Sequence, residues 1–245
     1  MVHPYAILIP ARYGSTRLPG KMLLRDTGKY LVQHTHERAL AAPGNPRVVV
    51  LTDDARVEAA VCSYGGEVLR TRADHASGTD RCAEAAARLP EPIVVNLQGD
   101  EPLIEPADLQ RLAQAVAGDA ADLATLAHPF AREQDMVPPQ VVKALRRPDG
   151  LAADFRRSVP TAAERRGFEV LHHLGVYAFR RERLSAFAAL PPSPRELTER
   201  LEQLRALDAG WRVRVLTSTR PGFGIDTRED YERLVGLLVP GGREL

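Results

Sequence analysis

The sequence has few of the residues that mark several classes of protein. Among 245 residues it has only two cysteines, Cys62 and Cys82, and neither belongs to a CxxC pair or a cysteine and histidine cluster. We therefore expect both to be small buried residues of helical segments rather than a disulfide or a metal site. No apolar run approaches the ~20 residues that span a bilayer, and the N-terminus lacks the features of a signal peptide. These absences predict a soluble protein of the reducing cytoplasm.

Net charge is also nearly absent. The chain has 33 Lys and Arg against 32 Asp and Glu, a formal net charge of +1. No overall field therefore draws it to nucleic acid or to an anionic membrane, and we expect neither as a partner. The hydrophobic share of 44% and the charged share of 27% are ordinary for a globular protein, and the length suits one large domain or two small ones.

Short apolar runs alternate with helical patterns through the first half of the chain. The runs that predict strands lie at residues 5–11, 47–53, 67–71, 92–98 and 122–130. The segments that predict helices lie between them, at 34–42, 54–66, 77–89 and 106–118. Because these strands are almost continuously apolar, they indicate a mostly parallel sheet that is covered on both faces.

The second half is less regular. Residues 140–157 predict two strands around the turn "PDG", which form a β-hairpin. The other predicted strands cover 170–181 and 211–220, and the predicted helices cover 181–190, 198–210 and 227–239. The sequence therefore predicts an α/β fold with a mostly parallel central sheet and a hairpin-containing second half.

A basic loop, "PARYGSTRLPGK" at residues 10–21, follows the first strand. It carries Arg12, Arg17 and Lys21 around two glycines, which let backbone N–H groups approach an anion closely. Arginine and lysine add charge-assisted bonds to phosphate oxygens. The loop is not a P-loop because GxxxxGK[ST] is absent. We interpret it as a polyphosphate site; the alternative is a solvated basic loop.

Two adjacent acids end the strand in "NLQGDEPLI", residues 96–104. In a parallel sheet Asp100 would lie at the same edge as the basic loop, where it either pairs with arginine or holds Mg²⁺ on the polyphosphate. Asp226 follows glycines in "PGFGID", at the expected end of the last strand, and would complete a metal pair. Asp53 and Asp54 also follow a strand, but Asp54 suits a helix N-cap, so we assign both to structure.

Polar side chains gather in two segments of the second half. In "LHHLGVY", His173 and Tyr177 share one face of the predicted strand and His172 lies on the other. On a predicted helix over residues 193–205, three polar side chains share one face: Glu196, Glu199 and Gln203. Both sets suit a polyhydroxylated ligand. The alternatives are ordinary core or surface histidines and a solvated helix face.

Six segments together resemble the successive motifs of one family. They are "IPARYGSTRLPGK", "TRADHASGTDR", "VVNLQGDEPLI", "HHLGVYAF", "LEQLRAL" and "PGFGIDTREDYERL". In order and spacing, from residue 5 to about residue 235, they resemble the 3-deoxy-manno-octulosonate cytidylyltransferases, or CMP-KDO synthetases. The resemblance implies a three-layer fold of the nucleotide-diphosphosugar-transferase type and a homodimer. It also implies Mg²⁺-dependent transfer of a cytidylyl group from CTP to KDO, with pyrophosphate released, for lipopolysaccharide synthesis.

The resemblance also implies an organisation and a set of site residues. Residues 1–245 would form one domain, with a CTP-binding half at about 1–130 and a half for sugar-acid binding and dimerisation at about 131–220. Residues implied at the CTP phosphates are Arg12, Arg17 and Lys21, and those implied at the nucleoside are Ser77, Gly78, Thr79 and Gln98. Residues implied at Mg²⁺ are Asp100 and Asp226, which with Arg12 and Lys21 make up the catalytic set. Residues implied at the sugar acid are Arg157, His173, Tyr177, Glu202 and Gln203.

The sequence departs from the family pattern in the half that would bind the sugar acid. It reads "FRRSVPT" where the family often has "SRxxIPW", and "PPQVVK" in place of the asparagine-containing "NPNxVK", with Lys143 retained. His172 stands where a basic residue is usual. The resemblance thus supports cytidylyl transfer more strongly than it supports the identity of the sugar acid. The alternatives are transfer to another 2-keto sugar acid, such as amino-KDO or a sialic acid, and a catalytically silent nucleotide-binding paralogue.

Overall fold

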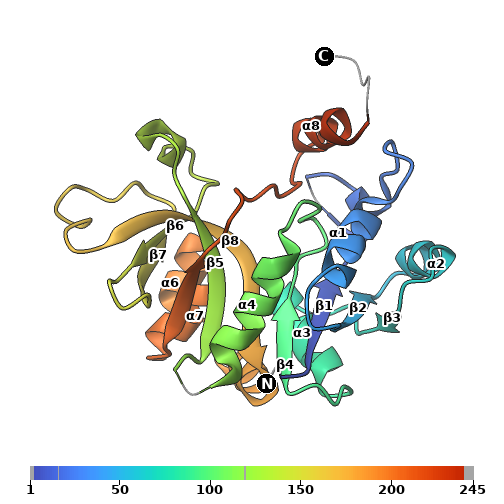
Figure 1. Ribbon diagram of the computed structural model, residues 1–245, viewed down its shortest axis with the longest axis horizontal. Coiled ribbons are helices and arrows are strands. Elements are labelled where there is room, and N and C mark those ends of the chain that lie inside the picture. Colours follow the sequence, from blue (N-terminus) through green and yellow to red (C-terminus); the bar gives the residue numbers. More distant parts are fainter. Residues whose placement is uncertain (1–2, 16, 119, 240–245) are drawn as a thin grey trace.

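One mixed β-sheet forms the centre of the protein (Figure 1), for which a computed structural model describes residues 3–15, 17–118 and 120–239. Seven strands follow one another across the sheet in the order β3-β2-β1-β4-β8-β5-β9. In chain order they are β1 (Tyr5–Pro10), β2 (Arg47–Thr52), β3 (Val68–Arg70), β4 (Ile93–Asn96), β5 (Leu123–Pro129), β8 (Glu169–Arg180) and β9 (Val213–Thr217). All neighbours are parallel except β8, which runs antiparallel to β4 and β5. The predicted mostly parallel sheet is therefore confirmed.

Helices cover both faces of the sheet, so the fold has three layers. Alternate side chains of β1 point to opposite faces, and Ile7 packs in one core cluster while Leu8 packs in the other. The helices that contribute to the Ile7 cluster are α1 (Leu31–Leu40), α2 (Ala55–Ser63) and α4 (Pro106–Ala117). The helices that contribute to the Leu8 cluster are α3 (Gly78–Ala86), α5 (Arg181–Ala189) and α7 (Gln203–Asp208). Every residue of β1 is buried, as the continuous apolar run predicts.

The predicted hairpin is present. Strands β6 (Lys143–Arg146) and β7 (Ala152–Arg156) pair antiparallel, and β6 also pairs with β8. Gly150 has a φ of 81°, a left-handed conformation that glycine adopts without strain. The Asp149 carboxylate accepts a hydrogen bond from the Leu151 N–H at 2.9 Å. The "PDG" sequence therefore forms the turn that its residues favour.

The single helix predicted over residues 198–210, with one polar face over 193–205, is wrong. The chain forms two short helices, α6 (Pro194–Glu199) and α7, separated at Arg200, whose φ and ψ are 55° and 49°. The break allows Leu201 to enter the core, at 5% exposure, and its N–H to bond to the Glu196 carbonyl at 3.3 Å. Glu196 is buried and pairs with Arg205 of α7 at 2.5 Å, so it does not lie on a solvated face.

The two cysteines differ in burial. Both are free, and Cys82 is buried as predicted, but Cys62 is exposed. The buried side of α2 is made by Val57, Ala60 and Val61, at the spacing of one helix face, and Cys62 lies off that face. Within the described ranges, no helix combines the length and the apolar character that a membrane crossing requires.

The chain ends by returning to its N-terminal loop. After β9 an extended segment leads to α8 (Arg228–Leu238), which lies near the loop after β1 in Figure 1. Tyr231 and Leu234 of α8 form a small core cluster with Leu18, Leu31 and Ile225. This packing brings residues from the two ends of the sequence to one site. Two short 3-10 helices, η1 (Lys21–Leu23) and η2 (Glu133–Met136), complete the described elements.

Candidate functional site

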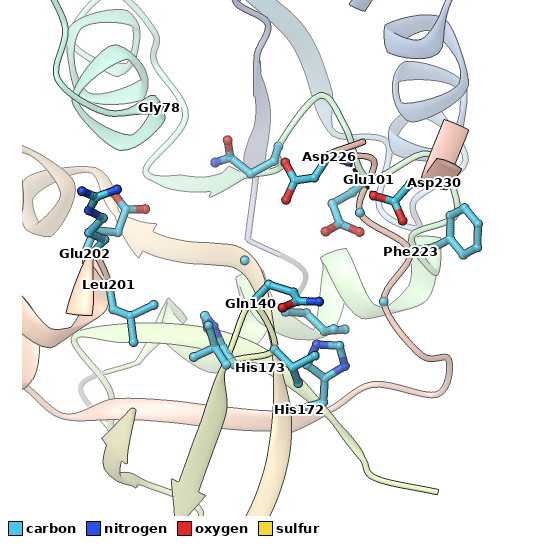
Figure 2. A pocket seen from close by; sticks show the side chains of 18 of the residues that line it. Gly78, Glu101, Gln140, His172, His173, Leu201, Glu202, Phe223, Asp226 and Asp230 are labelled. Atoms are coloured by element: carbon cyan, nitrogen blue, oxygen red, sulfur yellow. Dashed lines mark hydrogen bonds between the residues drawn. The ribbon is translucent and has the colours of Figure 1, made fainter. Parts of the chain in front are cut away.

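Two adjoining cavities form one cleft beyond the carboxyl ends of β1 and β4. The larger has a volume of about 1000 Å³ and the smaller about 370 Å³. The two cavities share five of their lining residues: Arg17, Ser77, Gly78, Gln98 and Asp226. Figure 2 shows Glu101, Asp226 and Asp230 on one side of the larger cavity. Leu201 and Glu202 lie on another side, and His172 and His173 lie between the two groups. The cleft is therefore lined by both halves of the chain.

Lys21 lies at the centre of a charged cluster that it forms with Asp100 and Asp226. It begins η1, directly after Gly20, whose φ of 68° turns the loop back toward the sheet. Its ammonium lies 2.5 Å from an Asp100 carboxylate oxygen and 3.5 Å from one of Asp226, and it donates to the Ile225 carbonyl at 2.9 Å. The structure thus brings together Lys21, Asp100 and Asp226, residues that are far apart in the sequence.

Asp226 is positioned in this cluster by a different structural element from the one predicted. Strand β9 ends at Thr217, so Asp226 does not lie at a strand end as expected. It lies in the extended segment before α8, where the neighbouring Ile225 N–H bonds to the Asp100 carbonyl at 3.0 Å. Arg17 pairs with the Asp226 carboxylate at 2.8 Å. The predicted meeting of Asp226 with Asp100 and the basic loop is found, although the element that positions it is different.

Glu101 is a site residue that the sequence reasoning missed. Burial, together with the nearby charges of Asp100 and Asp226, raises the pKa of Glu101 to about 8. Its carboxyl group accepts a backbone hydrogen bond from Phe223 and lies so close to Gly224 that an added Cβ there would be 3.1 Å away. The sequence signal for Glu101 is the pair of adjacent acids in "GDEP", of which Asp100 alone is predicted to bind Mg²⁺.

The carboxylates in this cluster suit magnesium. In the described part of the chain, no three side chains of His, Cys, Asp or Glu gather as a closed metal site. Asp100 and Asp226 nevertheless both approach one positive charge, the Lys21 ammonium. Mg²⁺ uses one or two carboxylates and takes its remaining ligands from phosphates and water. A pair of hard oxygen donors beside a basic loop fits that requirement.

Arg12 lies within electrostatic reach of the ion pair between Arg81 and Asp53. It lines the smaller cavity, and burial together with the nearby Arg81 charge lowers the pKa of Arg12, while Asp53 opposes the shift. Arg81 is fully buried and pairs with Asp53 at 2.9 Å. The Asp54 side chain accepts from the Arg56 N–H at 2.9 Å and caps α2. The assignment of both aspartates to structure is confirmed.

The residues that the resemblance implies at the nucleoside divide into two groups. Three of them line the cleft, namely Ser77, Gly78 and Gln98. Ser77 is also the N-cap of α3, in a capping box with Asp80. Thr79 is 1% exposed and does not line the cleft. Its hydroxyl donates to the Glu202 carboxylate at 2.7 Å, so Thr79 orients a cavity residue from behind.

His173, Tyr177 and Gln203 form a buried polar group at the larger cavity. The Tyr177 hydroxyl donates to the Gln203 side-chain oxygen at 3.1 Å, and the Gln203 nitrogen lies 3.5 Å from His173 Nδ1. The other ring nitrogen of His173 lies 2.9 Å from the Thr125 hydroxyl. Burial lowers the pKa of His173 to about 3, so its ring is neutral near pH 7. His172, on the opposite face of β8, stacks on Phe130 and also lines the cavity.

Arg157 is not brought to the cleft. Its guanidinium donates to the Glu199 carbonyl at 2.7 Å and to the Pro139 carbonyl at 3.2 Å, and it does not line either cavity. The Lys143 ammonium donates to the Arg157 carbonyl at 2.5 Å. Both cations therefore join backbone segments of the second half. The structure does not support the implied place of Arg157 beside the sugar-acid carboxylate.

Comparison with known proteins gives consistent matches. Residues 6–215 match the family described as Cytidylyltransferase. A 3-deoxy-manno-octulosonate cytidylyltransferase of Anaeromyxobacter dehalogenans (strain 2CP-C) is 49% identical over 241 residues, which cover 96% of this chain and 98% of that protein. One from Escherichia coli is 43% identical over 235 residues, which cover 95% of each.

A solved structure of CMP:2-keto-3-deoxy-manno-octonic acid synthetase complexed with CTP is also similar. It superposes with a TM-score of 0.89 at 42% identity, covering 96% of this chain and 98% of that one. A cytidylyltransferase from Leptospira borgpetersenii, at 23% identity and a TM-score of 0.64, shares the fold. Given these identities over nearly the full length, this chain belongs to the 3-deoxy-manno-octulosonate cytidylyltransferase family.

Proposed function

We propose that this protein transfers the cytidylyl group of CTP to the anomeric hydroxyl of KDO, giving CMP-KDO and pyrophosphate for lipopolysaccharide synthesis. The observation that carries the proposal is the convergence of Lys21, Asp100 and Asp226 beside the cleft. The uncharged side chains of His173, Tyr177 and Gln203 line the larger cavity of the same cleft. Family membership and the similarity to a synthetase complexed with CTP support it.

The first obstacle to the reaction is the repulsion between two anionic substrates. Two unit charges ~4 Å apart repel by about 4 kcal/mol at an effective dielectric constant of 20. We assign Arg12, Arg17 and Lys21 to the CTP phosphates because all three line the smaller cavity. Their charges would offset this repulsion and stabilise the charge that develops as pyrophosphate leaves. The protein would act mainly by positioning the hydroxyl in line with the α-phosphorus.

Asp100 and Asp226 would hold Mg²⁺ between the basic loop and the segment before α8. When bound, the metal supplies positive charge to the phosphate oxygens and polarises them. Lys21 and Arg17 orient the two carboxylates through the ion pairs at 2.5 Å and 2.8 Å. Glu101 fastens the segment that carries Asp226 through its hydrogen bond from Phe223.

The rest of the cleft would hold the nucleoside and the sugar acid. We assign Ser77, Gly78 and Gln98 to the cytosine and ribose, with Thr79 holding Glu202 in place. Neutral His173, Tyr177 and Gln203 would exchange hydrogen bonds with the sugar hydroxyls. This division assigns residues of about 1–130 to CTP and residues of about 131–220 to the sugar acid and dimerisation, within one domain of residues 1–245.

The experiment that tests the proposal supplies the purified protein with CTP, Mg²⁺ and a panel of 2-keto sugar acids. We expect pyrophosphate release with KDO, and mass spectrometry should identify CMP-KDO as the product. If amino-KDO or a sialic acid reacts faster than KDO, that acid and not KDO is the substrate. Binding of CTP without pyrophosphate release for any acid would instead indicate a silent nucleotide-binding protein.

We also propose that the enzyme is a cytoplasmic homodimer. Its two cysteines are free, which suits a reducing compartment. The family resemblance is what supports the dimer. Light scattering of the purified protein should give twice the chain mass of 26.9 kDa. A mass of one chain at micromolar concentration would contradict the dimer.

A further inference from the structure

Arg200 has an unusual backbone conformation for an arginine. It closes α6 with a φ of 55°, and within the described ranges the only other positive-φ residue that is not glycine is Asn45. The left-handed conformation at a helix C-terminus is usually adopted by glycine or asparagine, because a Cβ is disfavoured there. Backbone strain of this kind gathers at functional sites.

The turn at Arg200 does not itself need an arginine side chain. Its contacts are made by the main chain, since the Arg200 N–H bonds to the Glu196 carbonyl and its carbonyl accepts from Arg157 at 3.4 Å. The side chain is exposed and lines the larger cavity. In Figure 2 the residues that follow it, Leu201 and Glu202, lie across the cavity from Asp226. Arg200 directly precedes these residues in the chain and is a cation that the second half contributes to the lining of the larger cavity.

The other cations of the larger cavity are already paired. Arg17 contacts Asp226 at 2.8 Å, and Arg233 lies 3.8 Å from Asp230. The Arg233 guanidinium also lies 5.1 Å from the centre of the Phe223 ring. Arg200 makes no ion pair with any described residue, and Arg157 donates to backbone carbonyls instead of facing the cleft. Among the described arginines of the larger cavity, Arg200 is thus the one that binds an anion without giving up an acidic partner.

We propose that Arg200 binds the carboxylate of the sugar acid and selects acidic over neutral sugars. This inference rests on the proposed function. It assigns a substrate contact to Arg200, a residue to which the family motifs in the sequence assign no role. One observation favours a carboxylate over a CTP phosphate. The cations assigned to the phosphates, Arg12 and Lys21, line the smaller cavity, and Arg200 lines only the larger one. The guanidinium fork can bind both oxygens of a carboxylate at once.

Arg200→Gly is the variant that tests the proposal without harming the fold. Glycine adopts a φ of 55° freely, so the melting temperature should equal or exceed that of the wild type. The KM for KDO should rise at least about tenfold, the scale of losing a hydrogen bond to a charged group. The KM for CTP should change less than twofold. Arg166→Gln, an exposed arginine of the second half outside the cavity, is the matched control and should change neither.

The preference for an acid gives a second readout. The wild type should favour KDO over its C1 amide, and Arg200→Gly should lose most of that preference. An unchanged KM for KDO together with an unchanged acid-to-amide ratio would overturn the role of Arg200 while leaving cytidylyl transfer intact. A rise in the KM for CTP alone would overturn it too, by placing Arg200 at the nucleotide. If calorimetry shows that the CTP-bound wild type binds no 2-keto sugar acid, both proposals fail together.

Discussion

Replacing Asp100 with asparagine isolates the charge of the acid beside Lys21. Asparagine has nearly the same shape, and its side-chain oxygen still accepts from the Lys21 ammonium. At an effective dielectric constant of 20, a unit charge pair at the 2.5 Å of Lys21 and Asp100 is worth about 7 kcal/mol before desolvation. Desolvation of the two groups and the repulsion between Asp100 and the buried Glu101 oppose this attraction. Lys21 also keeps Asp226 at 3.5 Å in the variant, so we expect little loss of stability.

The effect on catalysis should be much larger. The variant keeps one of the two carboxylates proposed to hold Mg²⁺, and removing one major electrostatic stabiliser lowers turnover on the order of a hundredfold. The assay is pyrophosphate release at saturating CTP and KDO while Mg²⁺ is titrated. Turnover should fall about a hundredfold and the Mg²⁺ midpoint should rise.

The control for this experiment is Asp135→Asn. Asp135 also pairs with an arginine, Arg132 at 2.9 Å, but it lies in η2, outside the cleft. Its turnover should stay within about twofold of the wild type. If Asp100→Asn keeps turnover within threefold at every Mg²⁺ concentration, with circular dichroism unchanged, the metal role of Asp100 is wrong.

Three further changes test the site and its support. His173 keeps a folded pKa of about 3 against ~6.5 when unfolded, so only the unfolded chain gains this proton as pH falls below ~6.5. The free energy of unfolding of the wild type should therefore fall by about 2 kcal/mol between pH 7 and pH 5 because of this group. Urea unfolding of His173→Gln should not show this fall. In Gly78→Ala the new Cβ would lie 3.1 Å from the Gln98 side-chain oxygen, so steady-state kinetics should show a several-fold higher KM for CTP alone. Arg205→Met leaves Glu196 buried without its partner, and urea unfolding should show a loss of about 3–5 kcal/mol. An unchanged value in any of these assays would contradict the contact it tests.

The sequence was most informative where one local pattern decides the structure. The apolar runs of the first half fix strands that must be buried on both faces, and the positions after them fall at one sheet edge. This is why the meeting of Asp100 with the basic loop at Lys21 could be predicted. The "PDG" turn and the Asp54 cap were predictable for the same reason, because neighbouring residues supply both partners.

Tertiary contacts decided the rest. The break at Arg200 follows from burying Leu201, which helical periodicity in the sequence does not reveal. Asp226 is placed by the return of the chain to the N-terminal loop, not by a strand end. Arg157 has the residue type of a carboxylate ligand, but three carbonyls far from it in the sequence hold its guanidinium.

The most direct measurement is the initial rate of pyrophosphate release by the wild-type protein from CTP and KDO, with Mg²⁺ and then with the metal removed by a chelator. We predict release that requires CTP, KDO and Mg²⁺ together and stops when any one is omitted. Release at the same rate without a divalent metal would refute the metal site formed by Asp100 and Asp226. No release with all three present would refute cytidylyl transfer to KDO.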